Sequence, residues 1–319
     1  DESHREQHEV RGDPALGPGD FLHARATGCI RSAEAYADRL ERLELPAGAE
    51  ALGTLRAHLG ASGPLADPSS IVVKQRLEFT PPVRLPAALT VLRGDFSHAV
   101  VASDGTPQTI DVSAASPTFI ARADVPPLFI ETLLLAEDAA FFSHRGLDLS
   151  EVPKAVAASQ AKETPVRGAS TITQQLAKNL FLSRERTLRR KLQELALAFL
   201  LESTLGKDRI LEIYLNVIEW GPGLYGLRPA ASHYFGKEPT ALTPKEMAFL
   251  VALIPGPTRY QRSFEEGALS AGFEPLVTNL LAKLRSTGDL SEEEYAAALA
   301  ETLAFRRPAP AVPASPTGD

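Results

Sequence analysis

The sequence has few sulfur-containing residues and no long hydrophobic run, and each shortage limits which disulfide bonds, start site or membrane anchor this chain can contain. The single cysteine, Cys29, excludes an internal disulfide bond but leaves the redox compartment open. The only methionine is Met247, so we expect this chain to be a fragment or a processed form that does not begin at its natural start. No apolar run approaches the roughly 18–20 residues that cross a bilayer, so we expect any membrane anchor to lie outside this chain.

Basic residues are also fewer than acidic ones. Lys and Arg number 33 against 40 Asp and Glu, and the resulting net charge of -7 argues against a general nucleic-acid-binding protein. The seven histidines show no metal-ligand spacing, and neither a Gly-x-Gly-x-x-Gly pattern nor a Walker loop occurs. We therefore expect no required cofactor and no nucleic-acid partner, while assistance by a divalent cation, Mg or Mn, stays open.

Apolar residues make up 44% of the 319 residues, which is enough for one large or two medium domains. Ala and Leu at helical spacing predict an N-terminal helical region of unknown role over 1–68, helical chiefly from 20 to 60. Short β-branched runs predict a small β-rich segment over 69–115. A helical domain is predicted over 116–302, and a disordered Pro/Ala-rich tail over 303–319. The predicted fold class is mainly α, preceded by a small α+β region.

Glu137 is the first candidate for chemistry. Its spacing of three and four residues predicts a helical face shared with Leu133, Leu134 and Phe141. A carboxylate on an apolar face is costly unless it is used or paired, and desolvation would raise its pKa and suit it to proton transfer. The alternative is that Glu137 and Asp138 form an acidic pair that caps a helix or makes salt bridges at its end.

A second polar cluster occurs in GASTITQQLAKN, residues 168–179. Hydroxyls here can cap a helix, and amides and a lysine would then project from its first turns. A helix N-terminus with hydroxyls and a lysine is a reasonable anion site. The candidate binding residues are Ser170, Thr171, Gln174, Gln175, Lys178 and Asn179. The alternative is a capped amphipathic surface helix, which would have no use for the doubled glutamine.

Positive charge concentrates in residues 178–191, against the acidic balance of the whole chain. Six cations face a single acid in this stretch: Lys178, Arg184, Arg186, Arg189, Arg190 and Lys191. On the helix predicted here, Arg186 and Arg190 share a polar face with Glu194. The size of the patch suits a diphosphate better than a duplex. The alternative is a solvated charged face with pairs such as Arg190–Glu194.

A fourth segment, residues 207–237, carries Glu212 and Asn216 on a predicted helix before a turn rich in glycine and aromatic residues. The aromatics could line a sugar-binding groove or fill the core, and their helical spacing favours the core. They are Trp220, Tyr225 and Tyr234.

These segments together resemble a known family. The chain contains EDAAFFSHRGLD, GASTITQQLAKN, RTLRRKLQE and ILEIYLN, which are similar in order and spacing to signature blocks of the peptidoglycan glycosyltransferases, glycosyltransferase family 51. It also contains EWGPGLYGLRPAASHYFGK and LVALIPGPTRY, which resemble the monofunctional biosynthetic transglycosylases more than the bifunctional penicillin-binding proteins. The resemblance covers roughly residues 116–300.

The resemblance implies a lysozyme-like helical fold that acts at the outer, periplasmic face of the cytoplasmic membrane. It implies polymerisation of lipid II into β-1,4-linked glycan strands, with inversion at the anomeric carbon and release of undecaprenyl diphosphate. The partners it implies are lipid II, the growing glycan strand and the membrane surface. A separate transpeptidase is a further expected partner.

The family's motifs also imply roles for individual residues. Glu137 matches the general base that removes the proton from the acceptor's 4-hydroxyl, and Glu194 matches a second glutamate on the diphosphate side. The resemblance implies that the donor diphosphate binds Lys178, Arg186 and Arg190. It implies further substrate contacts at Ser170, Thr171, Gln174 and Gln175.

Some positions depart from the family pattern. Ala169 stands where the family often has a second glycine, and Arg228 and Pro229 replace the residues usual before the paired alanines. The counterpart of the family's membrane-dipping region, residues 150–166, is only modestly apolar. Residues 1–115 show no resemblance, and we interpret them as an accessory module that couples the enzyme to a partner.

Two other functions stay open at this point. A lysozyme-like muramidase would need a carboxylate pair but not the cations of residues 178–191, which therefore count against it. A non-catalytic glycan-binding scaffold would be expected to have lost a key charged residue. Glu137, Glu194 and Lys178 are all present.

Overall fold

The computed structural model describes residues 7–10, 21–30, 54–64, 72–80, 87–102, 105–148, 170–182, 187–259 and 261–306. The chain divides into two compact units. Unit 1 comprises Asp1–His98, Asp111–Ser116 and Glu137–Val217. Unit 2 comprises Ala99–Ile110, Pro117–Ala136 and Ile218–Asp319. Helices predominate, so the predicted mainly α fold class is confirmed.

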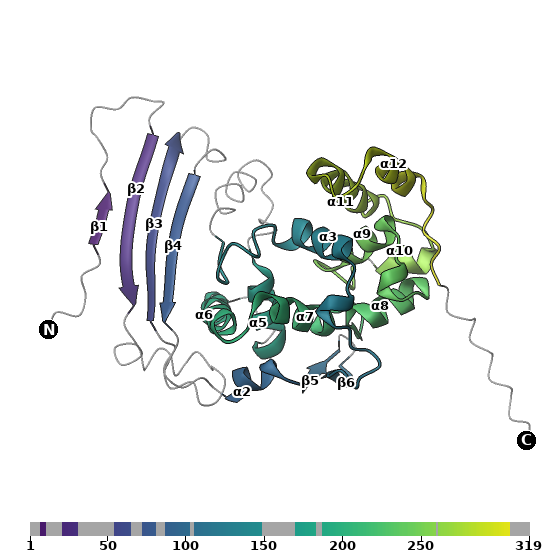
Figure 1. Cartoon of the computed structure of the whole chain (residues 1–319), viewed down its shortest axis with the longest axis horizontal. Coiled ribbons are helices and arrows are strands. Elements are labelled where there is room, and N and C mark those ends of the chain that lie inside the picture. Colours follow the sequence, from purple (N-terminus) through teal and green to yellow (C-terminus); the bar gives the residue numbers. More distant parts are fainter. Residues whose placement is uncertain are drawn as a thin grey trace, which may run out of the picture. The chain divides into compact units, whose positions relative to one another are not determined.

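Unit 1 contains a four-stranded antiparallel sheet in the order β1-β2-β3-β4 (Figure 1). Its strands are β1 (Gln7–Val10), β2 (Phe21–Ile30), β3 (Thr54–Pro64) and β4 (Val72–Thr80). The register pairs Ala26 with Leu59 and Ile30 with Leu55. At these two positions the register places apolar residues of β2 and β3 opposite each other.

The helix predicted from 20 to 60 is wrong wherever the structure describes this range. In β2, alternate positions are small or apolar (Leu22, Ala24, Ala26), and the residues between them are polar, which is the period of two of a strand. The Ala and Leu residues that suggested a helix therefore fit this shorter period as well. Pairing with β3 over ten residues then decides in favour of the strand. Residues 31–53 lie outside the described residues.

The helical part of unit 1 consists of α5 (Ile172–Phe181), α6 (Leu188–Thr204) and α7 (Lys207–Val217), which pack against one another. A short helix, α2 (Ala87–Thr90), and the 3-10 turn η3 (Val91–Arg93) precede them. Threonine caps begin two of these helices, because Thr171 accepts a hydrogen bond from the Gln174 amide and Thr187 from the Arg190 amide. The helices share a core that includes Leu176, Leu197 and Leu211, all without exposed surface.

Unit 2 is built around α9 (Pro244–Leu253), in which every residue after the first is buried. Three helices contact it: α8 (Leu227–Phe235), α11 (Glu274–Thr287) and α12 (Glu292–Ala300). Unit 2 also holds the hairpin of β7 (Glu219–Gly221) and β8 (Leu224–Tyr225), together with η5 (Pro239–Ala241) and α10 (Gln261–Glu266). Among the described residues, no helix has the length and apolar character that a membrane crossing needs.

Three of four further elements cross between the ranges of the two units, and the fourth, the 3-10 turn η4 (Arg122–Asp124), lies within unit 2. The three are β5 (Phe96–Val101) and β6 (Pro107–Val112), which pair as a hairpin, and α3 (Pro127–Glu137). Most of α3 belongs to unit 2, but its last residue, Glu137, begins a range of unit 1.

The aromatic residues of the fourth sequence segment belong mainly to the core of unit 2. Trp220 and Tyr234 have no exposed surface, and the Tyr234 hydroxyl donates a hydrogen bond to the Trp220 carbonyl at 2.9 Å. Phe129 packs against Trp220 with ring centroids 6.0 Å apart. The preference for core over a sugar groove is therefore confirmed for Trp220 and Tyr234, whereas Tyr225 is half-buried.

Candidate active site

Glu137 ends α3, and its carboxylate contacts α5 within unit 1. The Gln175 side-chain amide donates a hydrogen bond from Nε2 to Glu137 Oε2 at 2.7 Å. Burial raises the pKa of Glu137 above its ordinary value of 4.5, while the Gln175 hydrogen bond and the charge of Lys178 lower it. The charge of Asp138 adds a further increase. A half-buried carboxylate with a raised pKa and one neutral donor is suited to accept a proton.

The helical face predicted to carry Glu137 is only partly present. Leu133 and Leu134 are buried on α3 as expected, but α3 ends at Glu137, so Phe141 lies in the turn that follows. The prediction that Phe141 continues the helix is therefore wrong. Phe141 is nevertheless fully buried, and the Lys207 ammonium lies 4.2 Å from its ring centroid. The turn is thus anchored by a buried aromatic ring as well as by its own backbone hydrogen bonds, such as that of the Phe141 amide to the Asp138 carbonyl.

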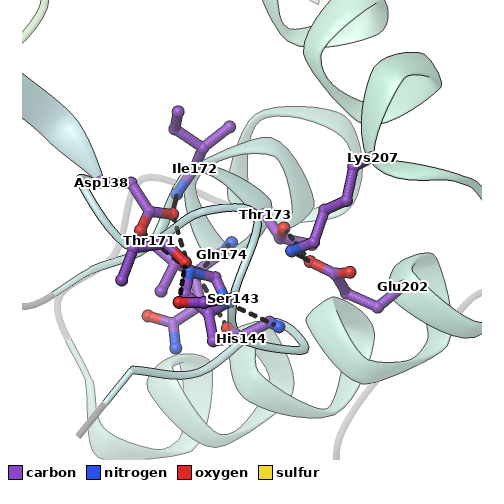
Figure 2. A network of polar contacts seen from close by, with 11 residues as sticks. Asp138, Ser143, His144, Thr171, Ile172, Thr173, Gln174, Glu202 and Lys207 are labelled. Carbon is purple, nitrogen blue, oxygen red and sulfur yellow. Dashed lines mark hydrogen bonds and ion pairs between the residues drawn. The ribbon is translucent and has the colours of Figure 1, made fainter. Parts of the chain in front are cut away.

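Asp138 has a different role from its neighbour Glu137. The His144 ring donates from Nε2 to the two carboxylate oxygens of Asp138 at 2.8 and 3.0 Å, and the Ile172 amide donates to Oδ2 at 2.9 Å (Figure 2). Because His144 Nδ1 accepts a hydrogen bond from the Gly146 amide, the ring proton must reside on Nε2. Asp138 therefore caps the start of α5, so the helix-capping alternative holds for Asp138.

Gly146 completes this turn at a position where no other residue fits easily. Its φ is +87°, and a Cβ placed there would lie 3.2 Å from the backbone of Ala198 on α6. Its carbonyl accepts a hydrogen bond from the Thr171 hydroxyl at 2.8 Å. The turn after Glu137 is consequently tied to Thr171, the N-cap residue of α5, and lies close against α6.

A second polar contact lies on another side of α5 (Figure 2). The Thr173 hydroxyl donates to Glu202 Oε1 at 2.6 Å, and the Lys207 ammonium donates to the same oxygen at 2.6 Å. These contacts join α5, the end of α6 and the start of α7. They use none of the residues predicted to bind substrate, so their role is to hold the three helices together.

The adjacent residues Gln174 and Gln175 contact different parts of the site. Gln175 contacts Glu137, whereas Gln174, one residue earlier, accepts a hydrogen bond from the Lys191 ammonium at 3.0 Å. The Ser170 hydroxyl accepts from the same ammonium at 2.7 Å. Lys191 also forms an ion pair with Glu194. Lys191 therefore links the start of α5 to α6, a role that the sequence did not assign to it.

Glu194 is enclosed by cations. Arg190 donates from Nη1 to Glu194 Oε2 at 2.6 Å, while Lys191 contacts the other oxygen. The Glu194 side chain is 4% exposed and that of Lys191 is 42% exposed. In the part of the chain that the structure describes, nothing accepts a hydrogen bond from the buried Arg190 Nε. The cluster therefore holds one buried carboxylate against two cations, of which Arg190 keeps a donor without an acceptor among the described residues.

The charge of Lys178 interacts with the charges of both Glu137 and Glu194. Desolvation lowers its pKa below the ordinary value of 10.5, and the nearby charges of Arg190 and Lys191 lower it further. The charges of Glu194 and Glu137 act in the opposite direction. Adjacent residues of α5, Gln175 and Gln174, contact Glu137 and Lys191 respectively, so the base candidate and the cation cluster both contact α5 in unit 1.

The remaining predicted residues are only partly accounted for. Thr171 caps α5, as predicted. Arg186 lies outside the described residues. Asn179 is half-buried, and its backbone carbonyl contacts His98 Nε2 at 3.1 Å, while substrate binding by its side chain stays a prediction. Asn216 donates to the Glu212 carbonyl on its own helix.

Sequence reasoning missed three contributors: Lys191, the Asp138–His144 pair and Tyr214. The Tyr214 hydroxyl donates to Gln175 Oε1 at 3.0 Å. Tyr214 sits within the apolar pattern of its helix, which gives no signal of a polar partner. The short spacing of Asp138, His144 and Gly146 was a usable signal, because an acid and a histidine so close together can hold a turn by a side-chain hydrogen bond, and the glycine allows the turn.

A divalent cation was left open by the sequence. In the described ranges, His, Cys, Asp and Glu residues form no group of three that could hold a metal ion. Whether a metal assists therefore stays a prediction. The described side chains could instead bind an anion, through Lys178, Arg190 and Lys191.

A raised-pKa carboxylate beside a cation cluster, held on packed helices, defines a class: group-transfer proteins that can remove a proton and stabilise an anionic leaving group. Comparison with known proteins gives the family. The transglycosylase family profile matches residues 106–274, more than half of the chain, and the chain belongs to that family.

Individual relatives agree with this assignment. Over 132 residues the chain is 46% identical to a biosynthetic peptidoglycan transglycosylase of Azoarcus sp. (strain BH72), covering 41% of this chain and 57% of the relative. Over 128 residues it is 48% identical to that of Nitrosomonas eutropha, covering 40% and 52%. The chain thus spans about half the length of these curated relatives. Among solved structures, penicillin-binding protein 1A from Haemophilus influenzae is 23% identical with a TM-score of 0.35, covering 67% of this chain and 22% of that one.

Proposed function

We propose that this chain is a peptidoglycan glycosyltransferase that polymerises lipid II into β-1,4-linked glycan strands and releases undecaprenyl diphosphate. The observation that carries the proposal is that adjacent residues of α5 contact a half-buried carboxylate and a cation cluster: Gln175 contacts Glu137, and Gln174 contacts Lys191. Membership of the transglycosylase family supports the same reaction class. The relatives named above are described as biosynthetic peptidoglycan transglycosylases, which supports this substrate.

In the proposed reaction, Glu137 removes the proton from the 4-hydroxyl of the acceptor sugar. The freed oxygen forms a bond to the anomeric carbon of the lipid-linked donor, and the bond from that carbon to the diphosphate breaks with inversion. The proton ends on Glu137, and the negative charge ends on the departing diphosphate. Lys178, Arg190 and Lys191 would stabilise that charge, which grows as the bond breaks.

Glu194 takes a supporting part in this proposal. A carboxylate next to the diphosphate would repel it, but Glu194 is neutralised by Arg190 and Lys191 on both of its oxygens. It therefore acts on the diphosphate side by holding two cations in place. The positive charge of those cations would then act on the diphosphate.

The substrate also implies a location and partners. We propose that the enzyme works at the outer face of the cytoplasmic membrane, where a lipid-linked donor would reach the site from the membrane surface. The growing glycan strand would be the acceptor, and a separate transpeptidase would crosslink the product. A divalent cation, Mg or Mn, could assist the diphosphate but is not required by the proposal.

Incubation of the protein with labelled lipid II tests the proposal. Formation of labelled polymer and of undecaprenyl diphosphate is expected. Cleavage of existing glycan without polymerisation would point instead to a muramidase, and binding without turnover would point to a scaffold. Either of these results would overturn the proposal. Addition of a chelator in a parallel reaction shows whether a divalent cation contributes.

A further inference from the structure

The Glu137 carboxylate is the end of a chain of hydrogen bonds that begins in the core of unit 1. Tyr214 on α7 donates its hydroxyl to Gln175 Oε1 at 3.0 Å, and Gln175 on α5 donates Nε2 to Glu137 Oε2 at 2.7 Å. We propose that Tyr214 is a positioning residue that acts through the Gln175 amide to hold Glu137 in place as the proton acceptor. This inference rests on the proposed function, in which Glu137 is the base.

The direction of the chain follows from the chemistry of its members. Burial, and then the charges of Glu137 and Asp138, raise the pKa of Tyr214 well above its ordinary value, so the phenol stays protonated and can donate. A donor at Tyr214 selects the carbonyl end of the Gln175 amide. The NH2 end is then left for Glu137. The reversed amide would turn its carbonyl oxygen toward a carboxylate, which is repulsive.

Tyr214 can influence the reaction only through this amide. Its side chain has no exposed surface, so it cannot touch a bound substrate. Its helix is anchored independently, because the Lys207 ammonium at the start of α7 is paired with Glu202 on α6. The phenol is therefore a rigid point from which a half-buried glutamine is oriented.

The other groups that face Glu137 are accounted for. Lys178 approaches from α5 and acts through its charge, and Asp138 follows Glu137 in the chain. Asp138 is held by the His144 ring and the Ile172 amide. Removal of the phenol oxygen changes none of these charges. The predicted effect of Tyr214→Phe is therefore a change in one hydrogen bond to Glu137.

The experiment compares Tyr214→Phe with Tyr234→Phe, a matched loss of a buried phenol hydroxyl. Tyr234 also donates one hydrogen bond from a fully buried ring, but its acceptor is the Trp220 carbonyl in unit 2. The first measurement is the pKa of the Glu137 carboxyl, followed by carbon-13 NMR of glutamate-labelled protein. The second is kcat/KM for labelled lipid II as a function of pH.

Tyr214→Phe is expected to raise the Glu137 pKa by about half to one unit, because the Gln175 amide loses the partner that orients it and its hydrogen bond to the charged carboxylate weakens. The acid limb of kcat/KM should move upward by the same amount and the activity should recover at higher pH. Tyr234→Phe should leave both unchanged. An unchanged Glu137 pKa in Tyr214→Phe, or an equal shift in Tyr234→Phe, overturns the inference.

A second variant makes the test independent of how well Tyr214→Phe folds. Gln175→Met removes the amide and should raise the Glu137 pKa at least as much; no shift would overturn the relay. In that background, adding Tyr214→Phe should cause no further shift, because the connection is already absent. A further shift would show that the phenol acts on Glu137 directly. The NMR measurement needs no turnover, so a shift without polymer supports the relay while refuting the proposed function.

Discussion

Glu137 and Glu194 are the same residue type in one unit, and their surroundings differ completely. Glu137 receives one hydrogen bond from a neutral amide, and burial raises its pKa. Glu194 is more deeply buried but is contacted by Arg190 and Lys191 on its two oxygens. Both oxygens of Glu194 are thus taken up by cations, whereas Glu137 has a single neutral donor. The comparison teaches that the kind and number of partners, more than the depth of burial, distinguishes the two carboxylates.

The largest difference between the two glutamates should appear on removal of charge at Glu137. Glu137→Gln keeps the shape of the side chain but cannot accept the proton, so kcat for lipid II polymerisation should fall by about 100- to 10,000-fold. The melting temperature should be unchanged or slightly higher, because a buried carboxylate is replaced by an amide. Glu131→Gln, on the exposed side of α3, is the matched control and should retain full activity. Near-normal turnover by Glu137→Gln would refute the role of base.

A smaller effect, on KM instead of kcat, is expected from a substitution of Glu194. Glu194→Gln releases Arg190 and Lys191 from their partner, so the cations lose their positions and KM for the lipid-linked donor should rise by about 10-fold. The control is Glu202→Gln, which removes another buried carboxylate of α6 that pairs with Lys207. Both variants should lose stability, but only Glu194→Gln should change KM. An equal change in the two would mean that Glu194 has no special relation to the donor.

Asp138, in the turn that follows Glu137, should affect the stability of the protein and not the reaction itself. Asp138→Ala leaves the His144 ring and the Ile172 amide without their acceptor, at a cost of about 2–3 kcal/mol of unfolding free energy. Urea denaturation measures this loss, with the exposed Asp124→Ala as control. If Asp138→Ala unfolds at the same urea concentration as the parent protein, the cap on α5 contributes nothing.

The smallest loss of stability is expected from a substitution of Gly146, where the turn contacts α6. Gly146→Ala requires a positive φ for alanine and brings its Cβ to 3.2 Å from the Ala198 backbone. Gly288 has the same φ of +87° but nothing within 4 Å of an added Cβ. Gly288→Ala should therefore cost about 1 kcal/mol for the backbone alone, and Gly146→Ala should cost more. Equal losses of melting temperature in the two variants would show that the close approach to α6 has no energetic effect.

The sequence predicted the members of the site better than their connections. The signature segments identified Glu137, Gln174 and Gln175, because each carries a polar group that an ordinary core helix would not use. Their partners were not predictable, since the contacts of Gln175 with Tyr214 and of Gln174 with Lys191 join residues that lie far apart in the chain. Those contacts depend on how α5, α6 and α7 pack.

The fold was predictable where a single apolar periodicity dominates the sequence. The prediction failed where a helical and an alternating periodicity compete. The helices from α5 to α12 follow clear apolar spacing and cap signals, such as Thr243 and Glu246 at the start of α9. In β2 and β3 the small residues satisfy both a helical and an alternating pattern. Strand pairing, which is non-local, decided between them. The end of α3 at Glu137 was missed for a similar reason, since Phe141 is buried in a turn without belonging to the helix.

The central claim is that Glu137 accepts the proton from a site where burial raises its pKa. The dependence of kcat/KM on pH, measured with labelled lipid II, tests it most directly. Activity requires the ionised form, so it should fall as pH drops through a pKa above 4.5 and as it rises through a Lys178 pKa below 10.5. A profile that stays flat down to pH 4.5, with full activity where Glu137 would be protonated, would contradict the account.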